Sequence, residues 1–136
     1  MSLYPYMSPE VPRIIPQNFL DFAKRFRKGI AVTESGMSSR NVELKSYGTV
    51  LYGSDADQTR FTEFLLKTAE RDGYEFVINF ASTDSDRLVS RLRPQMADLA
   101  RIWAYVGMQT SDRRPKPASA VWNGFFGAKY QPAKWW

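Results

Sequence analysis

The stretch from residue 48 to residue 82 constrains the fold most, because its pattern predicts a strand, a helix and a second strand in succession. Residues 48–52 (GTVLY) combine β-branched and aromatic side chains, which is typical of a short strand. Ser54 and Asp57 then form a Ser-x-x-Asp capping box, which predicts a helix that begins near Ser54. Apolar residues recur at helical spacing up to Gly73, a residue type that commonly ends helices in the left-handed conformation.

The strand predicted after this helix covers residues 74–81 and alternates large apolar side chains with smaller or polar ones. The large side chains share one face, which consists of Tyr74, Phe76, Ile78 and Phe80. Because an apolar strand face needs cover, we expect the 55–72 helix to pack on it and to bury Phe64, Phe76 and Ile78 together. If the two strands of this unit are parallel neighbours, the crossover between them should be right-handed.

Three shorter patterns precede this unit. Residues 17–28 predict a helix with one apolar face, which consists of Phe19, Phe22, Ala23 and Phe26. Residues 30–33 (IAVT) predict a short strand. Val42 and Leu44 alternate with charged residues, which predicts a strand that either continues into residues 49–52 or pairs near them.

The longest helical pattern follows the unit and extends from Leu88 to Val106. Pro94 interrupts it, because a proline ring clashes with the carbonyl group four residues earlier in a helix. The sequence therefore predicts either a kink near Ser90 or two helices, the second with Pro94 in its first turn.

The composition is ordinary for a globular protein, with 43% hydrophobic and 24% charged residues. Together with the patterns above, it predicts one compact α+β domain over residues 17–106, with a small mixed sheet of about three to four strands packed by two to three helices. Residues 1–16 contain four prolines, which predicts an extended Pro-rich arm. Residues 107–136 mix glycine and proline with aromatic and basic residues, which predicts a C-terminal arm.

The chain contains no cysteine and no histidine. This composition excludes disulfides, the usual zinc sites, and Ser-His or Cys-His nucleophile pairs. The glycine motifs that bind nucleotide phosphates are missing from the sequence as well. We therefore expect a protein that is not an enzyme, with no catalytic residues, no metal site and no cofactor. Since no apolar run approaches the roughly 20 residues of a membrane helix, we also expect no membrane span.

Residues 55–59 (DADQT) match the pattern D-x-D-x-T. In this motif the chain resembles haloacid-dehalogenase-type phosphatases, and the resemblance implies a nucleophilic carboxylate and its acid/base partner at Asp55 and Asp57. Helix capping accounts for both aspartates without catalysis. Together with Asp84 and Asp86 they could bind Mg²⁺ only if the ends of the two strands adjoin. A small carboxylate- and Mg²⁺-dependent phosphatase-like enzyme is the third hypothesis for the function.

The basic residues are concentrated in the C-terminal part of the chain. Residues 1–86 carry 10 basic and 12 acidic side chains, whereas residues 87–136 carry 9 basic and 2 acidic ones, so the net charges are −2 and +7. This asymmetry indicates an anionic partner for the C-terminal part. The candidate anion-binding residues are Arg87, Arg91, Arg93, Arg113 and Arg114.

Both predicted arms carry aromatic and aliphatic residues that need cover. We expect these residues to bind a partner: Tyr4, Tyr6, Ile14, Ile15, Trp122, Phe125, Phe126, Tyr130, Trp135 and Trp136. The favoured hypothesis is therefore a non-enzymatic accessory or scaffold subunit of a large multi-protein assembly, which contacts neighbouring subunits through its terminal arms.

The alternative hypothesis is a module that binds single-stranded nucleic acid through the arginines and aromatic residues of the C-terminal part. For either function we expect an intracellular location. An organellar assembly, such as a mitochondrial complex, suits a small subunit with two long arms, although no sequence feature selects one.

Overall fold

The computed structural model of the chain describes residues 1–5, 18–127 and 129. Within these residues the α-helices are α1 (Asp55–Asp72), α2 (Asp86–Val89), α3 (Pro94–Arg101) and α4 (Pro117–Gly124). Two short 3₁₀ helices are η2 (Asp21–Phe26) and η3 (Lys45–Tyr47). The strands are β1 (Ser2–Leu3), β2 (Ala31–Ser35), β3 (Val42–Leu44), β4 (Thr49–Leu51) and β5 (Phe76–Asn79). Of the helices in the described part of the chain, none has both the length and the apolar character that spanning a membrane requires.

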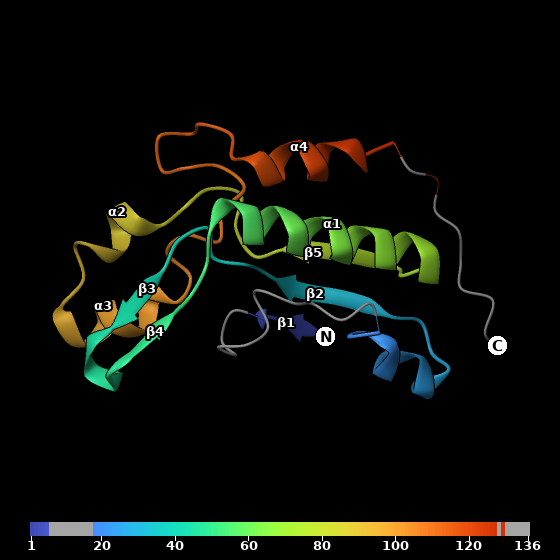
Figure 1. The fold of residues 1–136 in the computed structure, drawn as a ribbon, viewed down its shortest axis with the longest axis horizontal. Helices are drawn as coiled ribbons and strands as arrows, with labels where there is room; N and C mark the ends of the chain where they lie inside the picture. Colours follow the sequence, from blue (N-terminus) through green and yellow to red (C-terminus); the bar gives the residue numbers. More distant parts are fainter. Residues whose placement is uncertain (6–17, 128, 130–136) are drawn as a thin grey trace.

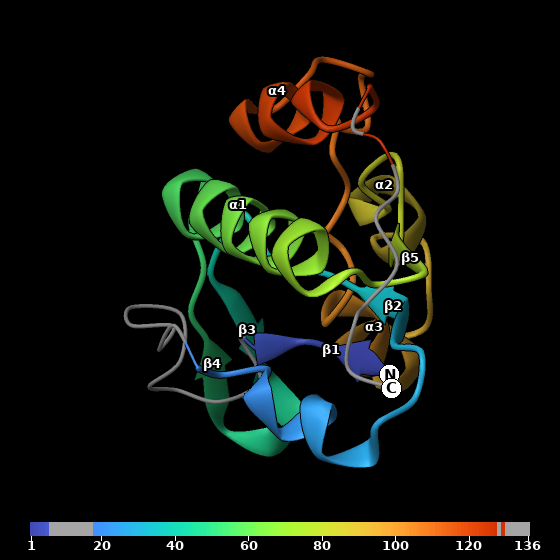
Figure 2. The same ribbon diagram turned by 90° about the vertical axis from the view of Figure 1, so that its right-hand side faces the viewer.

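The strands form two small sheets. Three parallel strands have the order β1-β2-β5, and β3 pairs with β4 as an antiparallel hairpin. Helix α1 lies along the three-stranded sheet, and α4 packs on α1 on the side away from β1 (Figure 1, Figure 2). The predicted α+β class is confirmed, with two sheets in place of the single mixed sheet.

The local signals of α1 are confirmed. The Ser54 Oγ accepts a hydrogen bond from the Asp57 backbone N–H at 3.1 Å and so caps the helix. Gly73 ends the helix with φ 63°, a left-handed conformation that glycine adopts without steric cost. On the exposed side, Lys67 and Glu63 form an ion pair of 2.6 Å between neighbouring turns.

The main core lies between α1 and the three-stranded sheet. Phe61 and Leu65 of α1 pack with Val32 of β2 and Leu3 of β1 in one hydrophobic cluster, and all four side chains are buried. Val77 of β5 is partly buried against this cluster. The register explains this arrangement, because Val32 lies opposite Val77 in the β2–β5 pair.

The expectation that Phe64, Phe76 and Ile78 are buried together is wrong. Phe64 packs partly buried against the core, but Phe76 and Ile78 are 49% and 48% exposed. Helix α1 supplies large side chains, so the sheet face beneath it takes the smaller valines, and alternation turns Phe76 and Ile78 to the opposite face. The strand at 48–52 is also no neighbour of β5, since β4 pairs with β3 and β5 pairs with β2.

The helix predicted over residues 17–28 is wrong in type and extent. In the described residues it is the short 3₁₀ helix η2, which ends at Arg27 with φ 46°. A 3₁₀ helix has about three residues per turn, so side chains four positions apart do not share a face. Phe22 and Phe26 are accordingly exposed, and only Ala23 is buried within η2.

The effect predicted for Pro94 is confirmed in its second form. Pro94 is the first residue of α3, where its missing N–H breaks no helical hydrogen bond, and α2 is a separate helix before it. Helix α3 packs against β3 of the hairpin, and α2 packs on α3 (Figure 1). The Asp98 carboxylate of α3 accepts a hydrogen bond from the Ser46 N–H at 2.5 Å, which joins α3 to η3.

Both ends of the described chain pack against residues 18–106. Thr33 donates its backbone N–H to the Met1 carbonyl at 3.0 Å, and Leu3 of β1 is buried in the core. In α4, Ala118 is fully buried against the rest of the molecule. Six of the predicted partner-binding residues lie outside the described residues: Tyr6, Ile14, Ile15, Tyr130, Trp135 and Trp136.

Candidate protein-interaction surface

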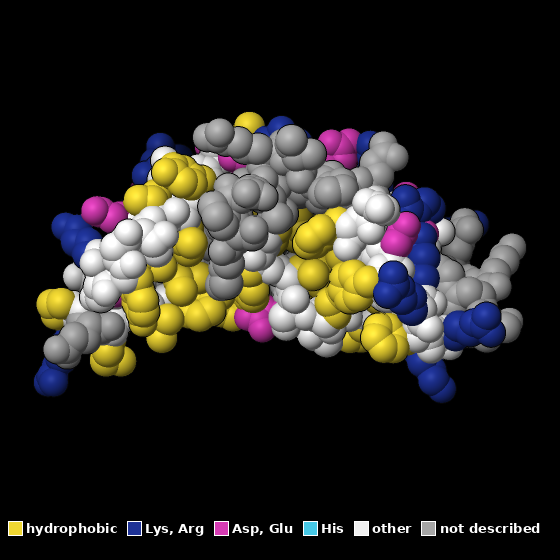
Figure 3. Space-filling view, turned by 60° about the horizontal axis from the view of Figure 1, so that its bottom comes forward, with side chains coloured by type: hydrophobic (Ala, Val, Ile, Leu, Met, Phe, Trp, Pro, Cys, Tyr) yellow, Lys and Arg dark blue, Asp and Glu magenta, His cyan; other side chains and the backbone are white. Residues whose placement is uncertain are grey.

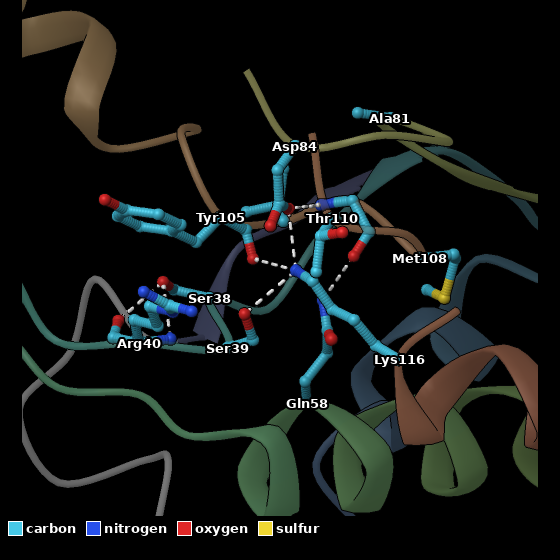
Figure 4. Close-up of polar contacts among 12 residues, drawn as sticks. Ser38, Ser39, Arg40, Gln58, Ala81, Asp84, Tyr105, Met108, Thr110 and Lys116 are labelled. Atoms are coloured by element: carbon cyan, nitrogen blue, oxygen red, sulfur yellow. Dashed lines mark hydrogen bonds and ion pairs between the residues drawn. The ribbon is translucent and has the colours of Figure 1, made fainter. Parts of the chain in front are cut away.

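A buried ion pair fixes the segment that leads into α4. The Lys116 Nζ lies 2.6 Å from the Asp84 carboxylate, 2.9 Å from the Ser39 Oγ and 3.1 Å from the Tyr105 carbonyl oxygen (Figure 4). Both charged side chains are 5% exposed. Since an ammonium group has three N–H donors, these three contacts use all of them.

Burial shifts both members of this pair toward their neutral forms. It raises the pKa of the Asp84 carboxyl and lowers the pKa of the Lys116 ammonium, and in each case the attraction between the two groups opposes the shift. The Asp84 carboxylate also accepts a hydrogen bond from the Gly107 N–H at 3.0 Å. Each charge therefore depends on the other for its stability.

Gln58 extends this polar network to the start of α1. Its side chain is almost fully buried and donates to the carbonyl oxygens of Met37 and Gly107, at 3.0 and 3.1 Å. A Cβ atom at Gly107 would overlap the backbone of Thr83 and Asp84, so only glycine allows this close approach. Because Pro117 begins α4 directly after Lys116, the network holds that end of α4 in place.

Helix α4 borders a surface groove on the β5 side of the molecule. The groove consists of two adjoining hollows of about 290 and 410 Å³, which share Val77, Trp122 and Phe126. We call it the β5–α4 groove and define it by Phe76, Val77, Ile78, Trp122, Phe125 and Phe126. Leu66 and Ala69 of α1 line one hollow, and Met108 lines the other.

Three predicted partner-binding residues meet in this groove. Trp122 belongs to the last turn of α4, and Phe125 and Phe126 are the first two residues after this helix. Trp122 and Phe125 are half-buried, whereas Phe126 is 77% exposed. Tyr4 does not belong to the groove, because it bonds to the Glu34 carboxylate and packs edge-on against Phe80 and Trp103.

The groove runs beside an edge of the sheet. In the described part of the chain β5 pairs only with β2, so its other edge presents backbone groups that no strand there satisfies. The exposed side chains of Phe76 and Ile78 belong to this strand. Figure 3, from the β1 side of the molecule, shows several clusters of hydrophobic side chains on the described surface.

The five candidate anion-binding arginines are all exposed. Arg87 forms an ion pair with Asp112, and Arg114 approaches the same carboxylate at 3.7 Å, so α2 and the 110–116 loop meet there. Arg113 lies in this loop with φ 62°. Arg91 and Arg93 lie between α2 and α3, and no ion pair engages either of them among the described residues.

The aspartates of the phosphatase-like hypothesis serve other contacts. Asp55 and Asp57 lie in the first turn of α1, where Asp57 accepts from the Ser54 hydroxyl at 2.7 Å and pairs with Arg60. Asp84 is engaged by Lys116, and Asp86 begins α2. Among residues 1–5, 18–127 and 129, no group of three acidic side chains is placed to hold a metal ion.

Two features of this surface were missed by the sequence reasoning. Phe76 and Ile78 were assigned to the core, because an alternating strand shows two faces without showing which one is covered. Lys116 was counted with the basic residues of an arm, and no local signal connects it with Asp84, which lies 32 residues earlier. Comparisons of this chain with protein-family models, with curated proteins and with solved structures find no match.

Proposed function

We propose that the chain is a non-enzymatic accessory subunit of a multi-protein assembly, and that a neighbouring subunit docks on the β5–α4 groove. One observation carries this proposal: Phe76 and Ile78 are about half exposed, Phe126 is 77% exposed, and all three residues line the groove beside an edge strand. Exposed apolar surface of this kind is typical of interaction sites. An intracellular assembly, such as a mitochondrial complex, is a suitable setting.

The groove combines two modes of recognition. The open edge of β5 can pair with an extended segment of a partner through backbone hydrogen bonds. Trp122 and Phe125 offer rigid aromatic surface beside it, and aromatic residues at the centre of an interface carry a large share of the binding energy. A neighbour that adds a strand to β5 would therefore cover the exposed aromatic residues as well.

Replacing Ile78 and Phe126 together by serine should disrupt this docking. Loss of two anchoring side chains should reduce the recovery of neighbouring subunits at least about 10-fold, because one anchor contributes about 2 kcal/mol or more. The measurement is quantitative mass spectrometry of the proteins that co-purify with the tagged chain from its source cells.

Leu88→Ser is the matched control, since Leu88 is 64% exposed on α2, away from the groove residues. Both variants should retain the wild-type free energy of unfolding within about 1 kcal/mol, because the replaced side chains are exposed. Equal recovery of neighbours by the groove variant and the wild type would contradict the proposal.

A second candidate function is binding of single-stranded nucleic acid, and the exposure of all five candidate arginines favours it. The Arg113→Ala, Arg114→Ala double variant should then weaken binding of a labelled oligonucleotide measured by fluorescence anisotropy. The slope of log K against log salt should fall by roughly 0.7 for each lost phosphate contact. Arg60→Ala, an exposed arginine of α1, is the control. Binding that does not respond to salt or to the double variant would reject this function.

A further inference from the structure

Helix α3 turns its large apolar side chains outward. Met96 and Leu99 are 61% and 51% exposed, and the two residues between them, Ala97 and Asp98, are buried. Residues three positions apart lie on the same side of a helix, so Met96 and Leu99 share one face. Two exposed arginines precede this face in the chain. We define the α3 surface by four residues: Arg91, Arg93, Met96 and Leu99.

We propose that the α3 surface binds an anionic lipid membrane, with α3 lying along the head groups. A membrane of this kind offers phosphate groups to the two arginines and, directly beneath them, hydrocarbon to Met96 and Leu99. This inference goes beyond the proposed function, because it concerns a second surface on a different helix from the β5–α4 groove.

The inward face of α3 is fixed by packing and by a buried carboxylate. Ala97 belongs to a small buried cluster that also contains Ala104. The Asp98 carboxylate accepts a hydrogen bond from the Ser46 N–H at 2.5 Å and forms an ion pair of 2.7 Å with Arg101. Helix α3 is therefore folded and oriented before a membrane is bound, so binding does not carry the entropy cost of ordering the helix.

The charge of this part of the chain favours an anionic partner. Residues 87–101 contain four arginines and one acidic residue, Asp98, which gives a net charge of +3, and the carboxylate of Asp98 is buried. In the part of the chain that the structure describes, no ion pair engages Arg91 or Arg93. Their guanidinium groups are therefore available to lipid phosphates. Figure 3 shows basic and hydrophobic side chains together at the end of the molecule that holds α3, on the left.

The aliphatic character of the α3 surface favours lipid over other anionic partners. Single-stranded nucleic acid is bound by stacking of its bases on aromatic rings, and Met96 and Leu99 offer no ring. Protein interfaces draw most of their binding energy from tryptophan, tyrosine and arginine, whereas leucine is under-represented among their anchors. Helices that lie in the membrane interface instead combine basic residues with exposed apolar side chains such as leucine.

A fluorophore at position 99 tests whether this face enters the membrane. The chain contains no cysteine, so Leu99→Cys provides a single site for a nitrobenzoxadiazole label on the full chain. Vesicles of phosphatidylglycerol and phosphatidylcholine in equal parts should shift its emission to shorter wavelength, because the label leaves water. Phe26→Cys with the same label is the control, since Phe26 is 70% exposed in η2 at the opposite end of the molecule (Figure 1). Its emission should not change.

Co-sedimentation with the same vesicles measures the affinity. The Arg91→Gln, Arg93→Gln variant should bind roughly 30-fold more weakly, because each arginine near an anionic membrane contributes about 5-fold. Arg25→Gln, Lys28→Gln is the control, since it removes two exposed charges at the η2 end and should leave the affinity nearly unchanged. The Met96→Gln, Leu99→Gln variant should bind at least about 10-fold more weakly, because these side chains then gain nothing from leaving water. All three variants should keep the wild-type midpoint of urea unfolding, since the replaced side chains are exposed.

An unchanged emission of the label at position 99 would overturn the inference. Equal affinity for vesicles of phosphatidylcholine alone would overturn it as well, because the arginines would then select no anionic lipid. A third contrary outcome is that the α3 variants bind vesicles normally but lose an oligonucleotide or a co-purifying protein, which would assign the α3 surface to that partner. The groove variant Ile78→Ser, Phe126→Ser should bind vesicles as the wild type does, so failure of this inference is distinguishable from failure of the proposed function.

Discussion

Replacing Phe61 by alanine should lower the free energy of unfolding by about 3–5 kcal/mol, as expected for removal of a large aromatic side chain from a packed core. Phe61 is 2% exposed and packs in the cluster that joins α1 to the sheet, with Val32 and Leu65. Water cannot fill the cavity favourably, because the surrounding side chains are apolar and offer a water molecule no hydrogen-bond partners. Urea denaturation followed by circular dichroism measures the change.

Phe76→Ala is the matched control, since it removes the same group from a side chain that is 49% exposed. We expect a loss of at most about 1 kcal/mol for this variant. The comparison tests which face of β5 is covered. A loss for Phe76→Ala as large as that for Phe61→Ala would place Phe76 in the core after all.

Replacing Lys116 by methionine should have a similarly large effect, with a loss of about 3–5 kcal/mol at neutral pH. The methionine keeps much of the side-chain volume but leaves the Asp84 carboxylate buried without its counter-charge. Lys67→Met is the control, because the Lys67–Glu63 pair is exposed and such pairs contribute only about 0.3–0.5 kcal/mol. Adding Asp84→Leu to Lys116→Met should recover much of the loss, since it removes the unpaired charge.

The pH dependence of the stability of the Lys116→Met variant is a second test of the Lys116–Asp84 pair. Burial raises the pKa of Asp84, and removal of Lys116 removes the attraction that opposes this shift. A carboxyl whose pKa is higher in the folded than in the unfolded state favours folding at low pH, and this contribution is lost as the pH rises through the folded pKa. The deficit of the variant relative to the wild type should therefore shrink as the pH is lowered from 7 toward 4. A deficit that is small at pH 7 or independent of pH would contradict the role assigned to this pair.

Much of the fold followed from local signals in the sequence. The cap at Ser54 and the left-handed Gly73 defined both ends of α1, because each acts on the nearest helical turn. The pairing of β3 with β4 was one of two alternatives that the sequence left open, the other being one continuous strand. The covered face of β5 could not be predicted, because it depends on the position of α1 above β2 and therefore on contacts between distant parts of the chain.

The candidate surface was predictable only in part. Trp122, Phe125 and Phe126 were recognised as partner-binding candidates because aromatic residues in a segment rich in glycine and proline need cover. Their position beside β5 was not predictable, since it results from the packing of α4 on α1. The segment that leads into α4 is also held by the Lys116–Asp84 pair, which no pattern of spacing reveals.

The parallel order β1-β2-β5 also has consequences for folding kinetics. The β3–β4 hairpin closes a loop of a few residues, as in the pair Leu44 and Thr49, and hairpins of this kind form within about 1–10 μs. The three-stranded sheet instead pairs Ser2 with Glu34 and Ala31 with Phe76, and such distant partners meet more slowly. We expect β5 to join late, since it has β2 alone as a described partner and the helix α1 precedes it in the chain. Before β5 joins the sheet, its backbone and its apolar side chains are exposed and can associate with other unfolded chains. Aggregation at that stage competes with folding.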